Sequence, residues 1–203
     1  PRGVCFGLFG PNGAGKSTLL RILGTQWVHS AGSVEVLGYS FPRDVRSAQR
    51  RLGAVFHQSF LRPELTLREN LRLTGELYGC EPQRTEERGA ELLARLSLTP
   101  RAHDRVGTFS QGMTKRASLA RSLLHDPELW ILDEPFSGLD RDGQEVLEEL
   151  LSKFVRDGGT VLLVTHEAQR GERLADHWIR LEGGKIVERS GSGAQSGAPA
   201  LGQ

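Results

Sequence analysis

The chain has 203 residues, of which 37% are hydrophobic and 25% are charged, and its formal net charge is +1. This size and composition suit one globular domain with a buried core. The near balance of charge lacks the basic footprint of a nucleic-acid-binding protein, so no nucleic-acid partner is expected. The longest apolar runs, 129–132 and 161–164, are far shorter than the roughly 20 residues of a membrane-spanning helix, so the chain is not expected to cross a membrane.

The first predicted element is an apolar strand at 4–9, followed at once by a glycine-rich loop. The loop matches the phosphate-binding pattern G-x-x-x-x-G-K-[ST] and precedes a helical segment at 18–23. Glycines let the backbone turn its N–H groups inward, the helix adds the positive end of its dipole, and a lysine and a hydroxyl suit phosphate and Mg²⁺. An ordinary glycine turn before a helix is the alternative. The predicted phosphate-contacting residues are Gly10, Pro11, Asn12, Gly13, Ala14, Gly15, Lys16, Ser17 and Thr18, and Ser17 is also a predicted magnesium ligand.

A second apolar strand at 52–56 is followed by about seventy residues without a strand pattern. This stretch contains helical patterns at 67–78 and 86–96, and a third begins near Ser110. Short apolar strands that alternate with helices predict a mostly parallel sheet. With the phosphate loop, the predicted fold class is α/β, a P-loop NTPase core of the RecA-like type. The core is expected over 1–57 and 126–189, with a helical subdomain inserted at 58–125.

Two adjacent acids, Asp133 and Glu134, end the third predicted strand at 129–132. The carboxyl ends of parallel strands are where ligands collect in such sheets. Asp133 is therefore predicted to hold Mg²⁺, and Glu134 to orient and deprotonate an attacking water in phosphoryl transfer. The alternative is an acidic turn after a strand, because Pro135 and Gly138 follow closely.

The remaining elements complete the domain. A fourth strand at 160–165 precedes His166, and apolar runs at 178–181 and 185–188 flank two glycines, which predicts a closing hairpin. Residues 190–203 are rich in Gly, Ser and Ala, so a disordered tail is expected there. The sequence contains only two cysteines and no signal-peptide pattern, which favours the reducing cytosol.

The stretch from Phe109 to Met113 reads F-S-Q-G-M and opens the third helix. With the phosphate loop and the acidic pair, it makes the chain resemble an ABC-type ATPase from about Phe6 to Arg189. The stretch is similar to the family's signature, usually L-S-G-G-Q, in which the serine and glycine bind the ATP held by a second protomer. The resemblance implies that Ser110 and Gly112 do so here. Phe109 and Met113 depart from the usual leucine and glutamine.

Three further residues take roles from the resemblance. Gln58 matches the family's Q-loop glutamine, which contacts Mg²⁺ and the attacking water. The string Ser137-Gly138-Leu139-Asp140 resembles the D-loop that crosses the dimer interface, so Asp140 is a predicted nucleotide-site residue. His166 matches the switch histidine beside the γ-phosphate. On their own, a strand-end glutamine, a helix-capping aspartate and a strand-end histidine would be structural in most proteins.

The resemblance implies an ATP-hydrolysing, Mg²⁺-dependent subunit, paired in a homodimer or with a related ATPase, that powers integral membrane permease subunits. It is expected in the cytoplasm, peripheral on the inner face of the cell membrane. The strings L-W-I-L-D-E-P-F and H-Q-S-F-L look like the haem-exporter ATPase of cytochrome c maturation. The alternatives are a soluble ABC-type ATPase of DNA repair or translation, and a nucleotide-gated binding module with little turnover.

Only nine residues precede Gly10. The family usually has an antiparallel strand segment and an adenine-stacking aromatic upstream of the phosphate loop, and this part is largely missing from the sequence. Stacking on an aromatic contributes roughly 1 to 3 kcal/mol per base. We therefore expect this chain to bind nucleotide more weakly than one that carries such a segment.

Overall fold

The computed structural model describes residues 2–190. The elements in chain order are β1 (Cys5–Phe9), α1 (Lys16–Leu23), β2 (Val34–Val36), β3 (Tyr39–Phe41), α2 (Val45–Gln49), β4 (Leu52–Val55), α3 (Leu67–Tyr78), α4 (Pro82–Arg95), α5 (Gln111–Leu123), β5 (Leu129–Asp133), α6 (Arg141–Arg156), β6 (Thr160–Val164), α7 (Ala168–Leu174), β7 (His177–Glu182) and β8 (Lys185–Arg189), with 3₁₀ turns at Thr99–Arg101 and Val106–Thr108.

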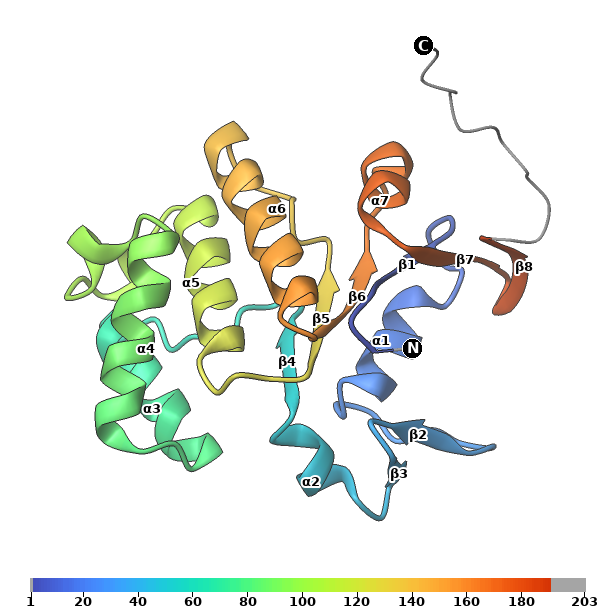
Figure 1. Ribbon diagram of the computed structural model, residues 1–203, viewed down its shortest axis with the longest axis horizontal. Coiled ribbons are helices and arrows are strands. Elements are labelled where there is room, and N and C mark those ends of the chain that lie inside the picture. The colour runs from blue at the N-terminus through green and yellow to red at the C-terminus, as the bar shows by residue number, and fades with distance from the viewer. Residues whose placement is uncertain (1, 191–203) are drawn as a thin grey trace, which may run out of the picture.

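A six-stranded sheet forms the centre of the molecule, in the order β4-β5-β6-β1-β7-β8 (Figure 1). Neighbouring strands from β4 to β7 are parallel, and β8 returns antiparallel to β7. The centre of β5 is completely buried, with Trp130, Ile131 and Leu132 all at 0% exposure. Such burial requires the uninterrupted apolar runs from which the strands were predicted. The predicted α/β fold with a mostly parallel sheet is confirmed.

The segment between β4 and β5 contains only helices, and α3, α4 and α5 pack together beside the sheet (Figure 1). Thr66 and Glu69 form a capping box that starts α3 at Leu67. One apolar core runs from these helices under the sheet, and the Trp130 indole donates to the hydroxyl of Ser122 on α5 at 2.9 Å. The helices are thus fixed to β5. The boundaries 58 and 125 of a separate subdomain stay a prediction.

A two-stranded antiparallel sheet, β2 and β3, was not predicted. Each strand has three residues, too few to show an alternating pattern. Its turn is made by Leu37 and Gly38, which both have positive φ, 54° and 83°, as a tight hairpin turn requires. The short helix α2 was missed for the same reason of length.

The C-terminal hairpin of β7 and β8 agrees with the prediction. Ser190, the first residue of the predicted tail, still belongs to the fold, because its N–H donates to the carbonyl of Trp178 and its hydroxyl accepts from the N–H of Trp178, both at 2.9 Å. The rest of the predicted tail, 191–203, lies outside the described residues. In the part that is described, no helix is long and apolar enough to cross a membrane.

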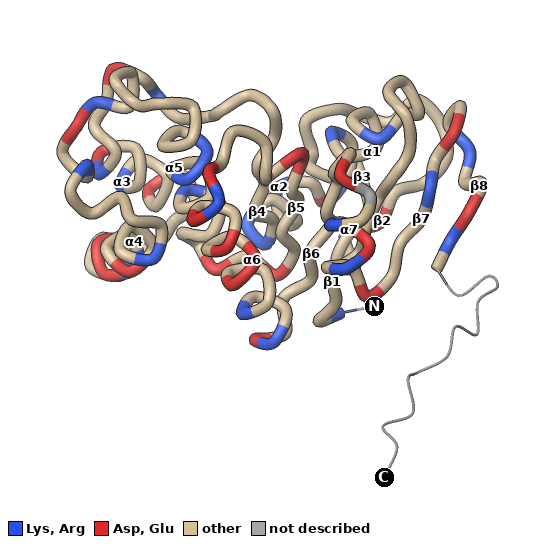
Figure 2. The backbone as a smooth tube through the Cα atoms, turned by 90° about the horizontal axis from the view of Figure 1, so that it is seen from above, with Lys and Arg blue, Asp and Glu red and all other residues tan. Residues whose placement is uncertain are grey.

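Lys and Arg residues are interspersed with Asp and Glu residues over the helices and the sheet edge (Figure 2). Many of them form ion pairs, such as Arg141 with Glu145 at 3.0 Å on α6. Exposed pairs of this kind contribute little to stability. The mixed surface agrees with the net charge of +1, from which no large basic face was expected.

Candidate functional site

The predicted site residues follow four neighbouring strands of the sheet. Gln58 follows β4, Asp133 ends β5 and Glu134 follows it, His166 follows β6, and Gly10 follows β1. Because β4, β5, β6 and β1 are adjacent and parallel, their carboxyl ends lie along one edge, at the top in Figure 1. Four segments far apart in the sequence therefore meet at this edge, where α/β sheets bind ligands.

The phosphate loop lies between the end of β1 and the start of α1. Gly10, Gly13 and Gly15 all have positive φ, at 140°, 80° and 99°. A Cβ on Gly10 would come within 2.2 Å of the carbonyl oxygen of Leu181 on β7, so only glycine fits there. Ala14 is buried, and its carbonyl accepts from the N–H of Gly184 at 3.1 Å, which ties the loop to the hairpin. The cradle thus lies against β7 and the turn between β7 and β8.

The start of α1 offers positive charge to an anion. Gly15 caps the helix without a side-chain hydrogen bond, and no acidic residue lies in the first turn. Lys16 folds back over the loop, where its Nζ donates to the carbonyls of Gly10 at 2.7 Å and Pro11 at 2.9 Å. Ser17 and Thr18 are exposed. Free N–H groups, the helix dipole and an ammonium group converge here, as a phosphate requires.

The acidic pair at the end of β5 is half-buried at the same strand edge as the loop. Burial and the neighbouring Glu134 raise the pKa of Asp133 above its ordinary value. Lys115 on α5 reaches the pair, and its Nζ donates to the backbone carbonyl of Glu134 at 3.1 Å. Burial lowers the pKa of Lys115, although both carboxylates favour its charged form. Lys115 could not be selected from the sequence, since a single lysine on a helix carries no pattern.

Glu134 and His166, both predicted catalytic residues, are in contact. The Nδ1 atom of His166 lies 2.8 Å from Oε2 of Glu134, and the His166 side chain is 71% exposed. The backbone of Glu134 is left-handed, with φ of 47°, and its N–H donates to the carbonyl of Val164 on β6 at 2.9 Å. Strained backbone of this kind persists where the surroundings over-determine it, often at functional sites.

The signature residues lie at the same edge but on the other side of the acidic pair. Ser110 caps α5 by accepting from the N–H of Met113 at 3.2 Å. A Cβ on Gly112 would lie 2.9 Å from the carbonyl oxygen of Gly138, so the start of α5 packs closely against the predicted D-loop. Figure 1 shows the ends of β5 and β6 between the start of α5 and the phosphate loop. The chain does not bring these two predicted sites together.

Asp140 and Gln58 have clear positions but no partner at the phosphate loop. Asp140 caps α6, and its carboxylate accepts from the N–H of Gly143 at 3.0 Å. Gln58 is exposed in the segment that leads from β4 towards α3. The roles of both residues, like those of the whole predicted set, stay predictions.

A hollow of about 810 Å³ lies beside the segment that carries Gln58, between α2, α3 and α5. We call it the β4–α3 groove. The apolar part of its lining is Leu52, Ala54, Phe56, Phe60, Leu61, Leu73, Leu77 and Tyr78. Phe60 and Leu77 are 49% and 78% exposed. Two large apolar side chains are therefore open to solvent at this groove.

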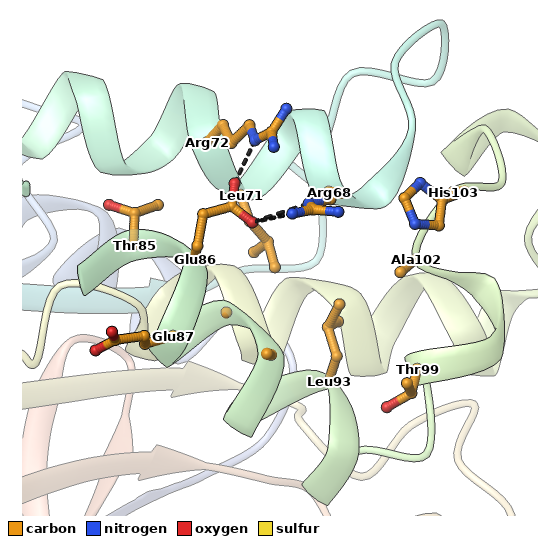
Figure 3. Close-up of a pocket in the computed structure, with 12 residues that line it drawn as sticks. Arg68, Leu71, Arg72, Thr85, Glu86, Glu87, Leu93, Thr99, Ala102 and His103 are labelled. Carbon is orange, nitrogen blue, oxygen red and sulfur yellow. Dashed lines mark hydrogen bonds and ion pairs between the residues drawn. The ribbon is translucent and has the colours of Figure 1, made fainter. Parts of the chain in front are cut away.

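Another cavity, of about 420 Å³, lies within the helical part, between α3 and α4 (Figure 3). Glu86 reaches across it from α4 and pairs with Arg68, at 2.7 Å, and with Arg72. These pairs hold the two helices together, and the two arginines hold the pKa of Glu86 below its ordinary value, with Arg72 contributing most. Glu86 and the two arginines thus neutralise one another, and the cavity shares no residue with the phosphate loop or the acidic pair.

Comparisons with known proteins agree with this geometry. The chain is 39% identical over 185 residues to the Nod factor export ATP-binding protein I of Rhizobium etli, which covers 91% of this chain and 58% of that protein. It is 36% identical over 186 residues to the linearmycin resistance ATP-binding protein LnrL of Bacillus subtilis, with 92% and 60% covered. The chain thus spans about three fifths of the length of these relatives. Neither name refers to haem, so the predicted haem-exporter type gains no support.

A solved structure shows the same fold in an assembled state. It is a dimeric ATP-binding cassette in a post-hydrolysis state bound to ADP and Pi, 28% identical, with a TM-score of 0.85 over 93% of this chain and 85% of that one. A family model described as ABC transporter matches residues 1–137, which include the phosphate loop, Ser110 and the acidic pair. The predicted ABC-type ATPase class is confirmed, and the chain belongs to the ABC transporter family.

Proposed function

We propose that the chain is the ATP-binding and ATP-hydrolysing subunit of an ABC exporter. The observation that carries this proposal is the contact between Glu134 and His166, 2.8 Å apart at the strand edge that also holds the phosphate loop. A carboxylate fixed by a histidine next to a phosphate cradle suits the activation of water for attack on a terminal phosphate.

Different residues of the chain have different roles in phosphoryl transfer. The backbone from Gly10 to Ser17 holds the phosphates, and Lys16 exchanges its two carbonyl contacts for phosphate oxygens. Glu134 accepts the proton of the attacking water, while His166 fixes the position of the Glu134 carboxylate. Positioning and charge neutralisation of this kind supply most of the rate enhancement in such reactions.

Ser17, Gln58 and Asp133 are the proposed magnesium ligands. They offer a hydroxyl, an amide and a carboxylate, all of them oxygen ligands. Mg²⁺ prefers a few protein oxygens and completes its shell with water and substrate phosphates, so this donor set fits it. When bound, the ion neutralises charge on the phosphates. The raised pKa of Asp133, caused by burial and by Glu134, is the expected state of a carboxylate that meets a cation only with its substrate.

A second protomer would complete the site. Ser110 and Gly112 lie at the strand edge but are separated from the phosphate loop of their own chain by the ends of β5 and β6. In a two-fold dimer, the N-terminal end of one α5 can face the phosphates held by the other chain. Asp140, at the start of α6, would lie in the same interface. The similar cassette of known structure is a dimer, which supports the proposal.

Integral membrane permease subunits are the proposed partners, and the β4–α3 groove is their proposed docking site. The groove adjoins the segment of Gln58, so a change at the nucleotide can reach the partner through that segment. The chain would then be peripheral on the inner face of the cytoplasmic membrane. The names of the similar proteins refer to Nod factor export and to linearmycin resistance, which supports export as the direction of transport. Nothing in them supports haem as the substrate.

The test is ATP hydrolysis by the purified chain and by Glu134→Gln. Loss of the general base should lower turnover by at least about a hundredfold. Glu167→Gln is the matched control, because Glu167 pairs with Arg170 at 2.9 Å and does not contact His166 through its side chain. Turnover by Glu134→Gln close to that of the control would refute the proposal, as would full activity in a strictly monomeric chain.

A further inference from the structure

Arg170 on α7 joins parts of the chain that lie far apart in the sequence. Its guanidinium lies 4.8 Å from the ring centroid of Phe136, which is buried just after the acidic pair. Its Nη2 donates to Oε1 of Gln144 on α6 at 2.8 Å. A cation over a buried aromatic ring and a charged hydrogen bond both depend on geometry, so together they fix the guanidinium. None of these three residues was predicted as a site residue.

Carboxylates complete the surroundings of the guanidinium. Its Nε lies 3.6 Å from Oε1 of Glu148 on α6, and the two side chains are only 23% and 25% exposed. Glu167 also pairs with it at 2.9 Å, but this carboxylate is 40% exposed, and exposed pairs contribute little. A guanidinium has five N–H donors, so one group can make all of these contacts at once. Arg170 is therefore fixed mainly by Phe136, Gln144 and Glu148.

The contacts of Arg170 lead to residues 137–140, the predicted D-loop. Phe136 immediately precedes this loop. Near the other end of the loop, Nε2 of Gln144 donates to the carbonyl of Leu139 at 3.3 Å. Because Arg170 contacts both Phe136 and Gln144, it supports the loop at its two ends.

The supported loop packs on the residues that are proposed to meet the partner's nucleotide. A Cβ on Gly112 would lie 2.9 Å from the carbonyl oxygen of Gly138, and a Cβ on Gly138 would lie 3.2 Å from the side chain of Gln111. The loop and the start of α5 are thus in direct contact. Since closely packed groups transmit displacements, a shift of the loop also shifts the start of α5.

The helix α7 is a firm base for this support. A Cβ on Gly171 would lie 2.4 Å from the ring of Phe9, so α7 packs closely on the end of β1. In the sheet, β1 lies between β6 and β7. Arg170 therefore joins the 137–140 loop to the interior of the sheet.

We propose that Arg170 is a positioning residue for the site that the second protomer completes. Its guanidinium keeps the 137–140 loop in place, and with it Ser110 and Gly112 where they meet the nucleotide of the partner chain. This inference rests on the proposed function and adds to it a residue that acts across the dimer interface. Within residues 2–190, the Arg170 side chain forms no hydrogen bond or ion pair with the phosphate loop or the acidic pair. Its loss should therefore impair the site of the partner chain and spare the site of its own chain.

The first test is ATP hydrolysis by Arg170→Leu. Leucine keeps an apolar contact with Phe136 but donates no hydrogen bond, so kcat should fall about tenfold, while binding of a fluorescent ATP analogue to the monomer stays unchanged. Arg173→Gln is the matched control, because Arg173 lies on the same helix and pairs with the same Glu148, at 2.7 Å. In the described part of the chain it forms no hydrogen bond or cation–π pair with Phe136 or Gln144, so kcat should stay within about twofold of the wild type.

Gln144→Leu tests the same support from α6. It leaves the ion pairs of Arg170 in place and should also lower kcat. Because both residues act on one loop through one contact, the double variant should be no slower than Arg170→Leu alone. Independent effects would instead multiply.

Mixed dimers show which of the two sites is affected. Lys16→Ala disables the phosphate loop of its own chain, and Ser110→Asp disables the signature of its own chain. A mixed dimer then has one complete site, with the phosphate loop from the Ser110→Asp chain and the signature from the Lys16→Ala chain. Arg170→Leu should lower the rate of the mixture about tenfold when it is placed in the Lys16→Ala chain, and change it less than about twofold when it is placed in the Ser110→Asp chain. Gln144→Leu should show the same pattern.

The other outcomes overturn the inference. Equal kcat of Arg170→Leu and Arg173→Gln removes the positioning role, as do multiplied losses in the double variant. A larger loss in the Ser110→Asp chain places the role of Arg170 in its own site, and equal losses in both chains show a general weakening of the fold; either result leaves the proposed function standing. A mixture that is inactive before Arg170 is changed removes the proposed two-chain site and the inference together.

Discussion

His125 makes the stability of the fold depend on pH in a way that the structure allows to be calculated. It follows α5, and its ring lies 3.7 Å from that of Tyr78 in a stacked pair. Its Nε2 lies 2.9 Å from the carbonyl oxygen of Leu52, while its Nδ1 is buried without a partner. The neutral ring therefore donates through Nε2. A second proton on Nδ1 would be buried and unpaired.

Burial lowers the pKa of His125 from 6.5 to about 4, and the nearby Arg121 adds to this while Leu52 and Asp126 oppose it. The unfolded chain thus takes up a proton at higher pH than the folded chain. The contribution of His125 to the free energy of unfolding is therefore fully present above pH 6.5. It is lost as the pH falls from 6.5 towards 4. Once the pH is below 4, this lowered pKa corresponds to a total loss of about 3 kcal/mol.

Urea unfolding measured at several pH values between about 7.5 and 4.5 would show this loss. His125→Gln is the control, because glutamine can still donate towards Leu52 but does not titrate in this range. Over this range, the difference in free energy of unfolding between the two proteins should change by about 2.5 kcal/mol, in favour of the wild type at high pH. Parallel curves for the two proteins would refute the reasoning.

Two further substitutions have matched controls in the chain. Lys115→Met should lower ATP turnover about tenfold, because it removes a charged hydrogen bond to the backbone of Glu134. Such a bond is typically worth about 1.5 to 3 kcal/mol. Equal turnover by this variant and by the control Lys153→Met, on α6, would contradict the prediction. Gly10→Ala should lower the free energy of unfolding by about 2 to 4 kcal/mol, because of backbone strain and the 2.2 Å approach of the added Cβ to Leu181. Gly13→Ala has no atom within 4 Å of the added Cβ and should lower it by only about 1 kcal/mol. Urea unfolding midpoints compare the two variants, and similar values would show that the loop can move to accommodate the methyl group at position 10.

Those parts of the fold that rest on local patterns could be predicted from the sequence. The strand at β5 was predicted because a strand buried on both faces needs an unbroken apolar run, and α3 was predicted with its observed bounds because its amphipathic pattern is long. The phosphate loop was predicted because its backbone needs positive φ, which glycine adopts far more easily than other residues, so the loop carries a recognisable glycine pattern. The segment of β2 and β3 was missed because three-residue strands carry no periodic signal.

Contacts between residues that are far apart in the sequence could not be predicted. Lys115 contacts Glu134 only because α5 packs beside β5, and the spacing of the two residues in the sequence does not indicate this contact. The separation of Ser110 from the phosphate loop of its own chain likewise follows from the strand order, which sequence patterns do not give. The residues that line the β4–α3 groove come from α2, α3, α5 and neighbouring loops, so their common surface also depends on tertiary structure.

The composite site between two chains can be tested most directly by mixing two inactive variants. Lys16→Ala disables the phosphate loop of its own chain, and Ser110→Asp keeps the cap of α5 but places a carboxylate against the phosphates of the partner. A mixed dimer then has one site with both faults and one site with neither. We predict that each variant alone is nearly inactive and that an equal mixture regains up to about a quarter of the wild-type rate, since half of the dimers are mixed. Wild-type activity of Ser110→Asp alone, or no recovery in the mixture, would contradict a site built from two chains.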